Sequence, residues 1–335
     1  MKNRKVAIIG CGAIFNRHYE SIQFNKEFDL VAVCDSQQIV ADNMSKKYGC
    51  KKYYDIETCL KESNADFYVL ATPNACHYEQ AILCIKNGKD FLVEKPVTLK
   101  TEHLHEVIEK AKKKNVNAYG VLQVRLNNSV SVLKECLEKN LLGKIRSASL
   151  VQRWQRPVEY FTGWRAIPEI GGGTLHEVGI HYIDVLQYLV GLPNIVSAKS
   201  YNTKHIHADI EDTVYAILDY GDFGGTLEVT ISAEPHNLEC SISILGSNGF
   251  IKLGGKALNI IESYNFLSNG AKKQFENIMK NYENTTYIPP NNYGSYLGSC
   301  PNHAGVYSNL ELFKIENTVN SMKIIEEIYS KVQEK

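Results

Sequence analysis

The first 120 residues alternate short, unbroken apolar runs with helical stretches. Unbroken apolar runs are typical of strands buried on both faces, and their alternation with helices is typical of a doubly wound parallel sheet. The expected strands are Lys5–Ile9, Leu30–Cys34, Phe67–Ala71, Phe91–Val93 and Val116–Val121. The expected helices cover residues 14–26, 37–48, 56–63, 75–87 and 100–114. This part of the chain therefore predicts an α/β domain.

After about residue 123 the pattern changes to strands that mostly follow one another without helices, which favours an antiparallel sheet. Those strands are Ile145–Trp154, Val196–Tyr201, Thr213–Tyr220, Gly224–Ala233, Leu238–Leu245 and Gly249–Leu253. Helices are expected over Ser129–Lys139, about Thr174–Val190 and Asn317–Lys331. We therefore expect two domains, residues 1–123 and 124–335. The second is an α+β domain with helices on one face of an open, mostly antiparallel sheet.

Charge and cysteine usage narrow the class of protein. Lys plus Arg (37) equals Asp plus Glu (37), so the chain has no global positive field for nucleic acid or an anionic membrane. It has no apolar run of about 18 residues, so no membrane span is expected. Its nine cysteines form no C-x-x-C pair, which disfavours a disulfide framework or a zinc site. With no apolar signal region at the N-terminus, we expect a cytoplasmic protein.

A glycine turn, GCGAIF at residues 10–15, follows the first strand and opens the first helix. Gly10 permits the tight turn, and Gly12 lets a pyrophosphate approach the backbone at the helix N-terminus. Phe15 stands where a third glycine is usual. A glycine pair alone often marks only a tight turn, but strand, turn and helix come in the required order. The turn therefore predicts a Rossmann domain, with Ala13 and Ile14 also at the cofactor; the alternative is a flavodoxin-like sheet with no dinucleotide.

Asp35 ends the second strand, 25 residues after Gly10. An acid near this offset bonds the adenosine ribose hydroxyls in dinucleotide-binding domains. Residues 36–38 include no Arg or Lys that could bind a 2′-phosphate. The sequence therefore favours NAD over NADP.

Polar residues also follow two later strands, and ligands bind at the carboxyl ends of strands in such sheets. Thr72, Asn74 and His77 are expected at the cofactor, although a helix-capping or surface role remains open for His77. Glu94 and Lys95, also expected at the cofactor, begin an E-K-P motif at the next strand end. A lysine beside a positively charged nicotinamide would give up its proton more readily, which suits proton handling. A solvated surface turn is the alternative.

A second motif, GGGTLHEVGIHYID at residues 171–184, opens the long helix of the second half. Thr174 with Glu177 predicts a capping box, so the helix begins there. At helical spacing Glu177, His181 and Asp184 lie on one face. Metal binding would be one reason for this grouping, and a core histidine satisfied by a neighbouring carboxylate would be another. No further ligand cluster is apparent, and no metal is expected.

Together, GCGAIFNRH, Asp35, ATPN with His77, EKP and GGGTLHEVGIHYID resemble the Gfo/Idh/MocA family of oxidoreductases over essentially the whole chain. The resemblance implies a Rossmann domain with an open-faced α+β domain, and Lys95 and His181 as the catalytic pair. Glu177 stands where many sugar-oxidising relatives have Asp and others have Asn. The resemblance further implies cofactor contacts from Gln123, Trp164 and Arg165. The free sheet face suggests a homo-oligomer, a dimer or tetramer.

Several stretches look most like the relatives that oxidise C3 of UDP-N-acetylglucosaminuronic acid for surface-polysaccharide sugars. Arg153, Arg156 and Arg165 precede the long helix, and arginine can bind phosphate or carboxylate through two hydrogen bonds. The expected loop 264–300 is rich in Asn and Tyr, whose side chains can stack on a uracil and bond hydroxyls. His205 and His207, read on a strand edge, are given no function. Substrate contacts are expected from Lys95, Arg125, Arg153, Arg156, Glu177, His181, Asp184, Tyr296 and His303.

The expected reaction is direct hydride transfer from the sugar to NAD. His181 would remove the hydroxyl proton while Lys95 stabilises the developing negative charge, and the two roles could be reversed. A dehydrogenase of a free sugar or inositol is the alternative enzyme. A non-catalytic, NAD-bound metabolite sensor is the alternative outside catalysis, and a scaffold protein fits poorly with polar groups gathered at strand ends.

Overall fold

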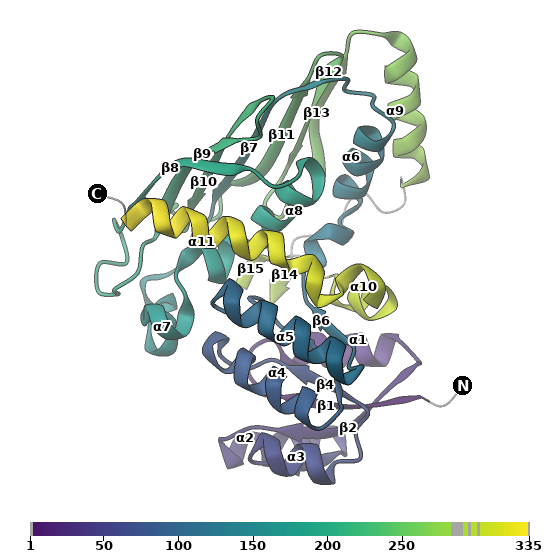
Figure 1. Ribbon diagram of the computed structural model, residues 1–335, viewed down its shortest axis with the longest axis vertical. Helices are drawn as coiled ribbons and strands as arrows, with labels where there is room; N and C mark the ends of the chain where they lie inside the picture. Colours follow the sequence, from purple (N-terminus) through teal and green to yellow (C-terminus); the bar gives the residue numbers. More distant parts are fainter. Residues whose placement is uncertain (1–2, 283–290, 294–295, 300–301, 334–335) are drawn as a thin grey trace. The chain divides into compact units, whose positions relative to one another are not determined.

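The computed structural model describes residues 3–282, 291–293, 296–299 and 302–333, and it divides into two compact units (Figure 1). The first unit consists of Met1–Leu122 with His303–Met322. The second consists of Gln123–Asn302 with Lys323–Lys335. The main boundary lies one residue from the expected position. The segment His303–Met322, expected in the second domain, instead packs with the first unit.

The first unit is built on a six-stranded parallel sheet of order β3-β2-β1-β4-β5-β6. Its strands are β1 (Arg4–Ile9), β2 (Phe28–Cys34), β3 (Lys51–Tyr53), β4 (Phe67–Leu70), β5 (Asp90–Val93) and β6 (Ala118–Gly120). This order confirms the predicted Rossmann sheet and places its topological switch point between β1 and β4. Strand β3 was not predicted, because two of its three residues are exposed and it shows no apolar run.

The helices of this unit follow the predicted apolar periodicity. They are α1 (Phe15–Phe24), α2 (Gln38–Tyr48), α3 (Ile56–Glu62), α4 (His77–Lys86), α5 (Thr101–Lys114) and α10 (His303–Ser308). In α5, Leu104, Val107 and Ala111 are buried at helical spacing. The helix ends at Asn115 in the left-handed conformation, which asparagine tolerates. All of β4 is buried, as its unbroken apolar run predicts.

The second unit is built on a seven-stranded sheet of order β13-β12-β11-β7-β10-β9-β8. Its strands are β7 (Ile145–Arg153), β8 (Asn194–Tyr201), β9 (Thr213–Asp219), β10 (Gly224–Thr230), β11 (Glu239–Gly246), β12 (Gly249–Gly254) and β13 (Ile260–Phe266). The neighbours pair antiparallel except β7 and β10, which are parallel. A parallel pair needs a long crossover, and the intervening helices, β8 and β9 provide it. The sheet is therefore mostly antiparallel, as predicted.

Helices α6 (Asn128–Glu138) and α8 (Ile180–Val190) pack on this sheet. Along β9, Val214, Ala216 and Leu218 are buried, whereas Tyr215 (43%) and Ile217 (52%) are exposed on the other face. One face of the sheet is therefore packed and the other open, as expected. A turn of π-helix, Leu175–Gly179, precedes α8, so the predicted helix is regular only from residue 180.

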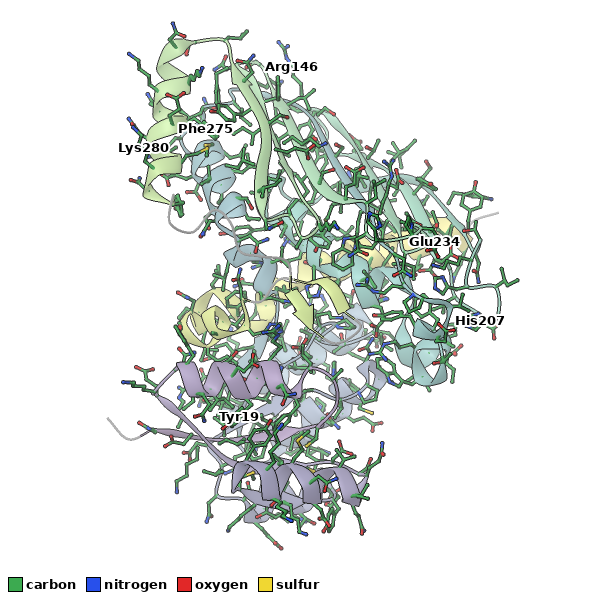
Figure 2. The ribbon with its side chains drawn as sticks, turned by 180° about the vertical axis from the view of Figure 1, so that it is seen from behind. Tyr19, Arg146, His207, Glu234, Phe275 and Lys280 are labelled. Carbon is green, nitrogen blue, oxygen red and sulfur yellow. The ribbon has the colours of Figure 1, made fainter. Side chains whose placement is uncertain are left out.

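Further helices and strands of the structure were not predicted, and some of them lie in the stretch 264–300 that was expected to be a loop. Strand β13 has mostly exposed residues, so its apolar periodicity is weak. Helix α9 (Asn269–Asn281) packs Phe275 against Tyr264 at 4.3 Å and Phe266 at 5.3 Å between ring centres (Figure 2). Strands β14 (Asn291–Tyr293) and β15 (Tyr296–Ser299) form an antiparallel pair, and α11 (Val319–Gln333) ends the chain. Over the described residues, no helix combines the length and apolar character needed to cross a membrane.

Candidate active site

The glycine turn of the first unit has the geometry that a dinucleotide needs. Gly10 has φ +94°, and a Cβ added to it would lie 2.4 Å from the Ala71 carbonyl oxygen, so only glycine fits. A Cβ on Gly12 would meet no atom within 4 Å, which leaves the backbone open to a ligand. No side chain caps the N-terminus of α1, and its first turn contains no acidic residue. Its positive end is therefore available for a pyrophosphate.

Phe15 replaces the third glycine by filling the core. Its side chain is fully buried, and its ring centre lies 5.4 Å from that of Tyr48 on α2. A third glycine normally allows close packing of helix on strand. Here the residue at that position packs its ring against α2 instead. Ala13 is exposed and Ile14 is half-buried, as residues beside a cofactor would be.

Asp35 links the second strand to the glycine turn. Its Oδ2 accepts a hydrogen bond of 2.9 Å from the Cys11 amide, and its Oδ1 accepts one of 2.9 Å from the Gln37 amide. A carboxylate offers about four acceptor positions. The half-buried Asp35 thus orders the turn and still has acceptor capacity for ribose hydroxyls. Ser36, Gln37 and Gln38 are exposed and uncharged, which agrees with NAD.

His77 ties together the loops that follow β4 and β5. It is fully buried, with Nδ1 2.7 Å from the Pro96 carbonyl oxygen and Nε2 2.9 Å from that of Thr72. Burial lowers the pKa of His77, whereas the hydrogen bonds to the two carbonyl oxygens act to raise it. His77 is therefore neither a helix cap nor a surface residue, the two alternatives that the sequence left open. It holds the Thr72 loop against the segment that carries Lys95, whose peptide bond to Pro96 is cis.

Glu94, directly before Lys95, belongs to a buried cluster. Its Oε1 lies 3.0 Å from Nε2 of His18 and 3.4 Å from Nε2 of His303. Its Oε2 accepts a hydrogen bond of 3.1 Å from the Lys95 amide, and Nδ1 of His18 lies 2.9 Å from the Tyr307 hydroxyl. The cluster joins α1, the end of β5 and α10, and it holds the backbone of Lys95. Glu94 was expected at the cofactor and His303 at the substrate; here both are buried and contact each other.

Both hydrogen bonds of His18 in this cluster are satisfied when His18 is neutral and Glu94 is ionised. Burial raises the pKa of Glu94, but hydrogen bonds from His18 and His303 outweigh that effect and hold the pKa well below its ordinary value. Burial also lowers the pKa of His18 and raises that of Tyr307. A neutral His18 then donates from Nε2 to the ionised Glu94 and accepts from the Tyr307 hydroxyl at Nδ1. Glu94 therefore keeps a negative charge beside the Lys95 amide.

In the second unit, the helix that carries His181 is capped by a distant residue. Oε1 of Glu211 accepts hydrogen bonds from the Thr174 amide at 2.8 Å and from the Tyr329 hydroxyl at 2.6 Å. The Thr174 hydroxyl donates to the Glu211 carbonyl oxygen, and Thr174 itself is already helical. The predicted capping box of Thr174 and Glu177 is therefore wrong. Burial raises the pKa of Glu211.

Glu177 and Asp184 each contact a basic residue that lies elsewhere in the sequence. Asp184 makes a bidentate pair with Arg125, at 2.7 and 2.6 Å, with side chains only 1% and 3% exposed. Glu177 lies 3.5 Å from Nε of Arg165 and accepts a hydrogen bond of 3.2 Å from the Tyr160 hydroxyl. Among the described residues, no group of His, Cys, Asp and Glu could hold a metal. Any substrate contact of Arg125 and Asp184 stays a prediction.

Arg153 lies on the half-exposed side of β7 and is occupied by carboxylates. Its Nε and Nη2 each donate to Glu228 at 2.6 Å, and Nη1 donates to Glu239 at 2.8 Å. The hydrogen bonds to Glu228 raise the pKa of the guanidinium. All three nitrogens therefore have protein partners. This arrangement weakens the predicted substrate contact of Arg153.

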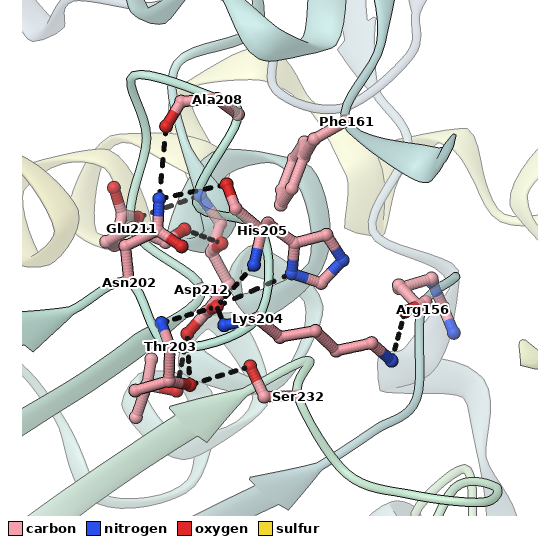
Figure 3. Close-up of polar contacts among 12 residues, drawn as sticks. Arg156, Phe161, Asn202, Thr203, Lys204, His205, Ala208, Glu211, Asp212 and Ser232 are labelled. Atoms are coloured by element: carbon pink, nitrogen blue, oxygen red, sulfur yellow. Dashed lines mark hydrogen bonds and ion pairs between the residues drawn. The ribbon is translucent and has the colours of Figure 1, made fainter. Parts of the chain in front are cut away.

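The loop from Asn202 to Asp212 braces the segment 154–161. Asp212 accepts hydrogen bonds from the amides of Lys204 (2.6 Å) and His205 (3.0 Å), as Figure 3 shows. Burial raises the pKa of Asp212, but the His205 side chain and these amide hydrogen bonds outweigh burial and lower the pKa. Nε2 of His205 lies 3.2 Å from the Pro157 carbonyl oxygen, and Nε2 of His207 lies 3.0 Å from that of Phe161. These histidines lie in a loop, not on the strand edge that was expected.

The remaining predicted residues take these places. Lys95, His181 and Trp164 are half-buried, and Asn74 and Gln123 are buried. Tyr296 begins β15, but its side chain lies outside the described part of the chain.

The fold and the cofactor residues define an NAD-dependent oxidoreductase. Residues 4–121 match the model of the oxidoreductase family with an NAD-binding Rossmann fold, and residues 130–252 match the GFO/IDH/MocA C-terminal domain. The scyllo-inositol 2-dehydrogenase (NADP(+)) IolU of Bacillus subtilis (strain 168) is 30% identical over 229 residues, 67% of this chain and 68% of that protein. The chain belongs to the Gfo/Idh/MocA family. The predicted family, fold class and NAD cofactor are confirmed.

Other relatives act on sugars. Glucose-6-phosphate 3-dehydrogenase of Bacillus subtilis (strain 168) is 27% identical over 243 residues, 71% of this chain and 69% of that protein. The WlbA dehydrogenase from Bordetella pertussis, solved with NADH and UDP-GlcNAcA, has a TM-score of 0.86 and 25% identity, covering 99% of this chain and 96% of that one. WlbA from Chromobacterium violaceum, also solved with NADH and UDP-GlcNAcA, has a TM-score of 0.87 and 25% identity, covering 99% and 94%. The chain is thus a member of a family of NAD-dependent sugar dehydrogenases.

Sequence reasoning missed the residues that hold the candidate site in place. His18 lies in the quoted GCGAIFNRH motif, but nothing local gave it a role. Tyr307, Glu211 and Tyr329 are distant in sequence from the groups they contact. Tyr160 carries no motif. Of these residues, only His18 could have been noticed in the sequence, because a histidine on an apolar helix face needs a polar partner.

Proposed function

We propose that this protein oxidises the C3 hydroxyl of UDP-N-acetylglucosaminuronic acid (UDP-GlcNAcA) with NAD, in the biosynthesis of surface-polysaccharide sugars. The observation that carries this proposal is the similarity to the two WlbA structures. Each aligns with 99% of this chain at 25% identity, and each was solved with NADH and UDP-GlcNAcA. The sequence relative IolU covers only 67% of the chain.

When bound, NAD would supply the acceptor for the hydride that leaves C3 of the sugar. His181, in the first turn of α8, removes the hydroxyl proton, and Lys95 donates a hydrogen bond to the same oxygen and stabilises its negative charge. Glu94 holds the amide of Lys95, and Glu211 holds the start of the helix that leads to His181. Both groups therefore extend from fixed backbone, which favours catalysis because little reorganisation is needed.

Two variants test this reaction. Lys95→Ala and His181→Ala should each lower turnover of UDP-GlcNAcA by about 10²- to 10⁴-fold, the range for loss of a general acid or base. NAD affinity, measured by calorimetric titration, should stay near that of the wild type. Near-normal turnover of Lys95→Ala would contradict the mechanism. The pH profile of kcat in each variant separates the two roles, because the variant that lacks the base loses the acidic limb.

A second candidate is a dehydrogenase of a sugar phosphate or a polyol. It is favoured by the similarity of the chain to glucose-6-phosphate 3-dehydrogenase and to the scyllo-inositol 2-dehydrogenase IolU. Product analysis after incubation with UDP-GlcNAcA, glucose 6-phosphate and scyllo-inositol distinguishes the candidates. NADH formation with none of them would instead favour the metabolite sensor.

A further inference from the structure

Five side chains of the second unit form a ladder in which aromatic rings and guanidinium groups alternate. Cζ of Arg156 lies 4.7 Å from the ring centre of Trp154 and 5.4 Å from that of Tyr160. Cζ of Arg165 lies 5.3 Å from the ring centre of Tyr160 and 4.3 Å from that of Trp164. Cations at these distances are attracted to the ring faces. The ladder therefore fixes two positive charges on one segment.

Only one of the two arginines has a carboxylate nearby among the described residues. Nε of Arg165 lies 3.5 Å from Oε2 of Glu177. Arg156 is only 6% exposed, yet it has no Asp or Glu within 4 Å in the described part of the chain. Its Nη1 donates to the Gln155 carbonyl oxygen at 2.8 Å, and its Nε has no hydrogen-bond partner there. The other buried arginine of this unit, Arg125, is paired with a carboxylate, as buried charges normally are.

The surroundings do not supply the missing negative charge. The Lys204 ammonium donates to the Arg156 backbone carbonyl at 2.8 Å, and it pairs with Glu234 (Figure 3 shows the contact with Arg156). On β7, Gln152 lies on the same buried face as Trp154. Gln152 is fully buried, and neither its amide nitrogen nor its oxygen has a partner among the described residues. Buried polar groups without partners are rare, so two of them close in sequence point to a ligand.

We propose that Arg156 binds the acidic group of the substrate, a carboxylate or a phosphate, and thereby selects anionic over neutral sugars. The inference rests on the proposed function and adds the residue that sets substrate class. A planar guanidinium binds either anion through two parallel hydrogen bonds. Trp154 and Tyr160 hold the plane of that group, so little side-chain freedom is lost on binding.

The test compares Arg156→Gln and Arg156→Lys with the wild type. Arg146→Gln is the control, because Arg146 is an exposed arginine on β7, the strand that ends three residues before Arg156. The substrates are UDP-GlcNAcA, UDP-N-acetylglucosamine, glucose 6-phosphate and the neutral sugar methyl glucoside. Arg156→Gln should lower kcat/KM for UDP-GlcNAcA, which carries both a carboxylate and phosphates, by about 10- to 100-fold, the range for hydrogen bonds to charged groups. The value for methyl glucoside should not change, and Arg146→Gln should match the wild type on all substrates.

The pattern of losses identifies the anion. A loss with UDP-GlcNAcA but not with UDP-N-acetylglucosamine assigns Arg156 to the carboxylate. A loss with both, and with glucose 6-phosphate, assigns it to phosphate. Equal losses on neutral and anionic substrates, or no loss, would overturn the proposal and leave Arg156 as a packing residue, with the proposed function intact. If Arg156→Gln does not fold, the anionic-to-neutral ratio of Arg156→Lys decides: an unchanged ratio overturns the proposal.

Failure of the proposed function has a different signature. If the wild type forms NADH with none of these sugars, the reaction is wrong. The subsite is then judged by calorimetric titration of UDP-GlcNAcA in the presence of NAD. Binding that is about 10-fold tighter to the wild type than to Arg156→Gln supports the subsite. Equal affinity for the two proteins, or no binding to either, overturns it.

Discussion

Asp184→Asn removes one half of the buried pair between Asp184 and Arg125. The two side chains are 1% and 3% exposed, and both carboxylate oxygens accept from the guanidinium. The variant leaves a buried guanidinium without its counter-charge. Breaking a buried pair in this way costs about 3 to 5 kcal/mol. A Coulomb energy of about 4 kcal/mol for charges roughly 4 Å apart at an effective dielectric constant of 20 agrees with that range.

Urea unfolding measures this cost in the unit that contains the pair. The chain has two tryptophans, Trp154 and Trp164, and both belong to the second unit. Their fluorescence therefore reports its unfolding. With an m-value of about 3 kcal/mol/M, the midpoint should fall by about 1 to 2 M urea at an unchanged slope.

Two comparisons can refute the reasoning. Arg153→Gln breaks a bidentate pair of similar geometry whose arginine side chain is 38% exposed, and it should cost about 1 kcal/mol or less. If Asp184→Asn costs no more than Arg153→Gln, burial is not what makes the pair important. The double variant Arg125→Met with Asp184→Leu should recover most of the loss. If it is as unstable as Asp184→Asn, the uncompensated charge is not the cause.

Three further predictions concern the turn, the buried cluster and the open sheet face. Gly10→Ala places a Cβ 2.4 Å from the Ala71 carbonyl oxygen, at a position with φ +94°. The affinity for NAD, measured by calorimetric titration, should therefore fall at least about tenfold. Unchanged affinity would show that the glycine turn can adapt to the added carbon. The pKa of Glu94 in the folded state lies below its unfolded value of about 4.3. The ionised carboxylate therefore stabilises the folded state above that pH, and this stabilisation is lost as the pH falls through the folded-state pKa. The difference in unfolding free energy between the wild type and Glu94→Gln should therefore be constant above about pH 5 and shrink below about pH 4, whereas a flat profile would contradict the ionised state. If the open sheet face forms the proposed homo-oligomer, Ile217→Lys should lower the mass measured by light scattering, and an unchanged mass would exclude this face.

Local sequence determined most of the first unit. Parallel strands buried on both faces must be apolar throughout, so the runs around Val6 and Val69 were legible without a structure. Gly10, Gly12 and Asp35 act through backbone conformation and position relative to a strand end, and both can be read from the chain. Strand β13 was missed because its exposed residues hide the apolar alternation. Helix α9 was missed because its Asn-rich composition suggested a loop, although Phe275 and Ile278 are buried at helical spacing.

Only the tertiary structure decided how the polar residues are partnered. Arg125, Asp184, Glu94 and His303 were all expected to contact a ligand, whereas the structure pairs Arg125 with Asp184 and Glu94 with His303. The helix expected to cap itself is capped by Glu211, 37 residues from Thr174. A buried charge must find its partner wherever the chain brings one within hydrogen-bond distance, and residues that meet this way leave no periodic signal in the sequence.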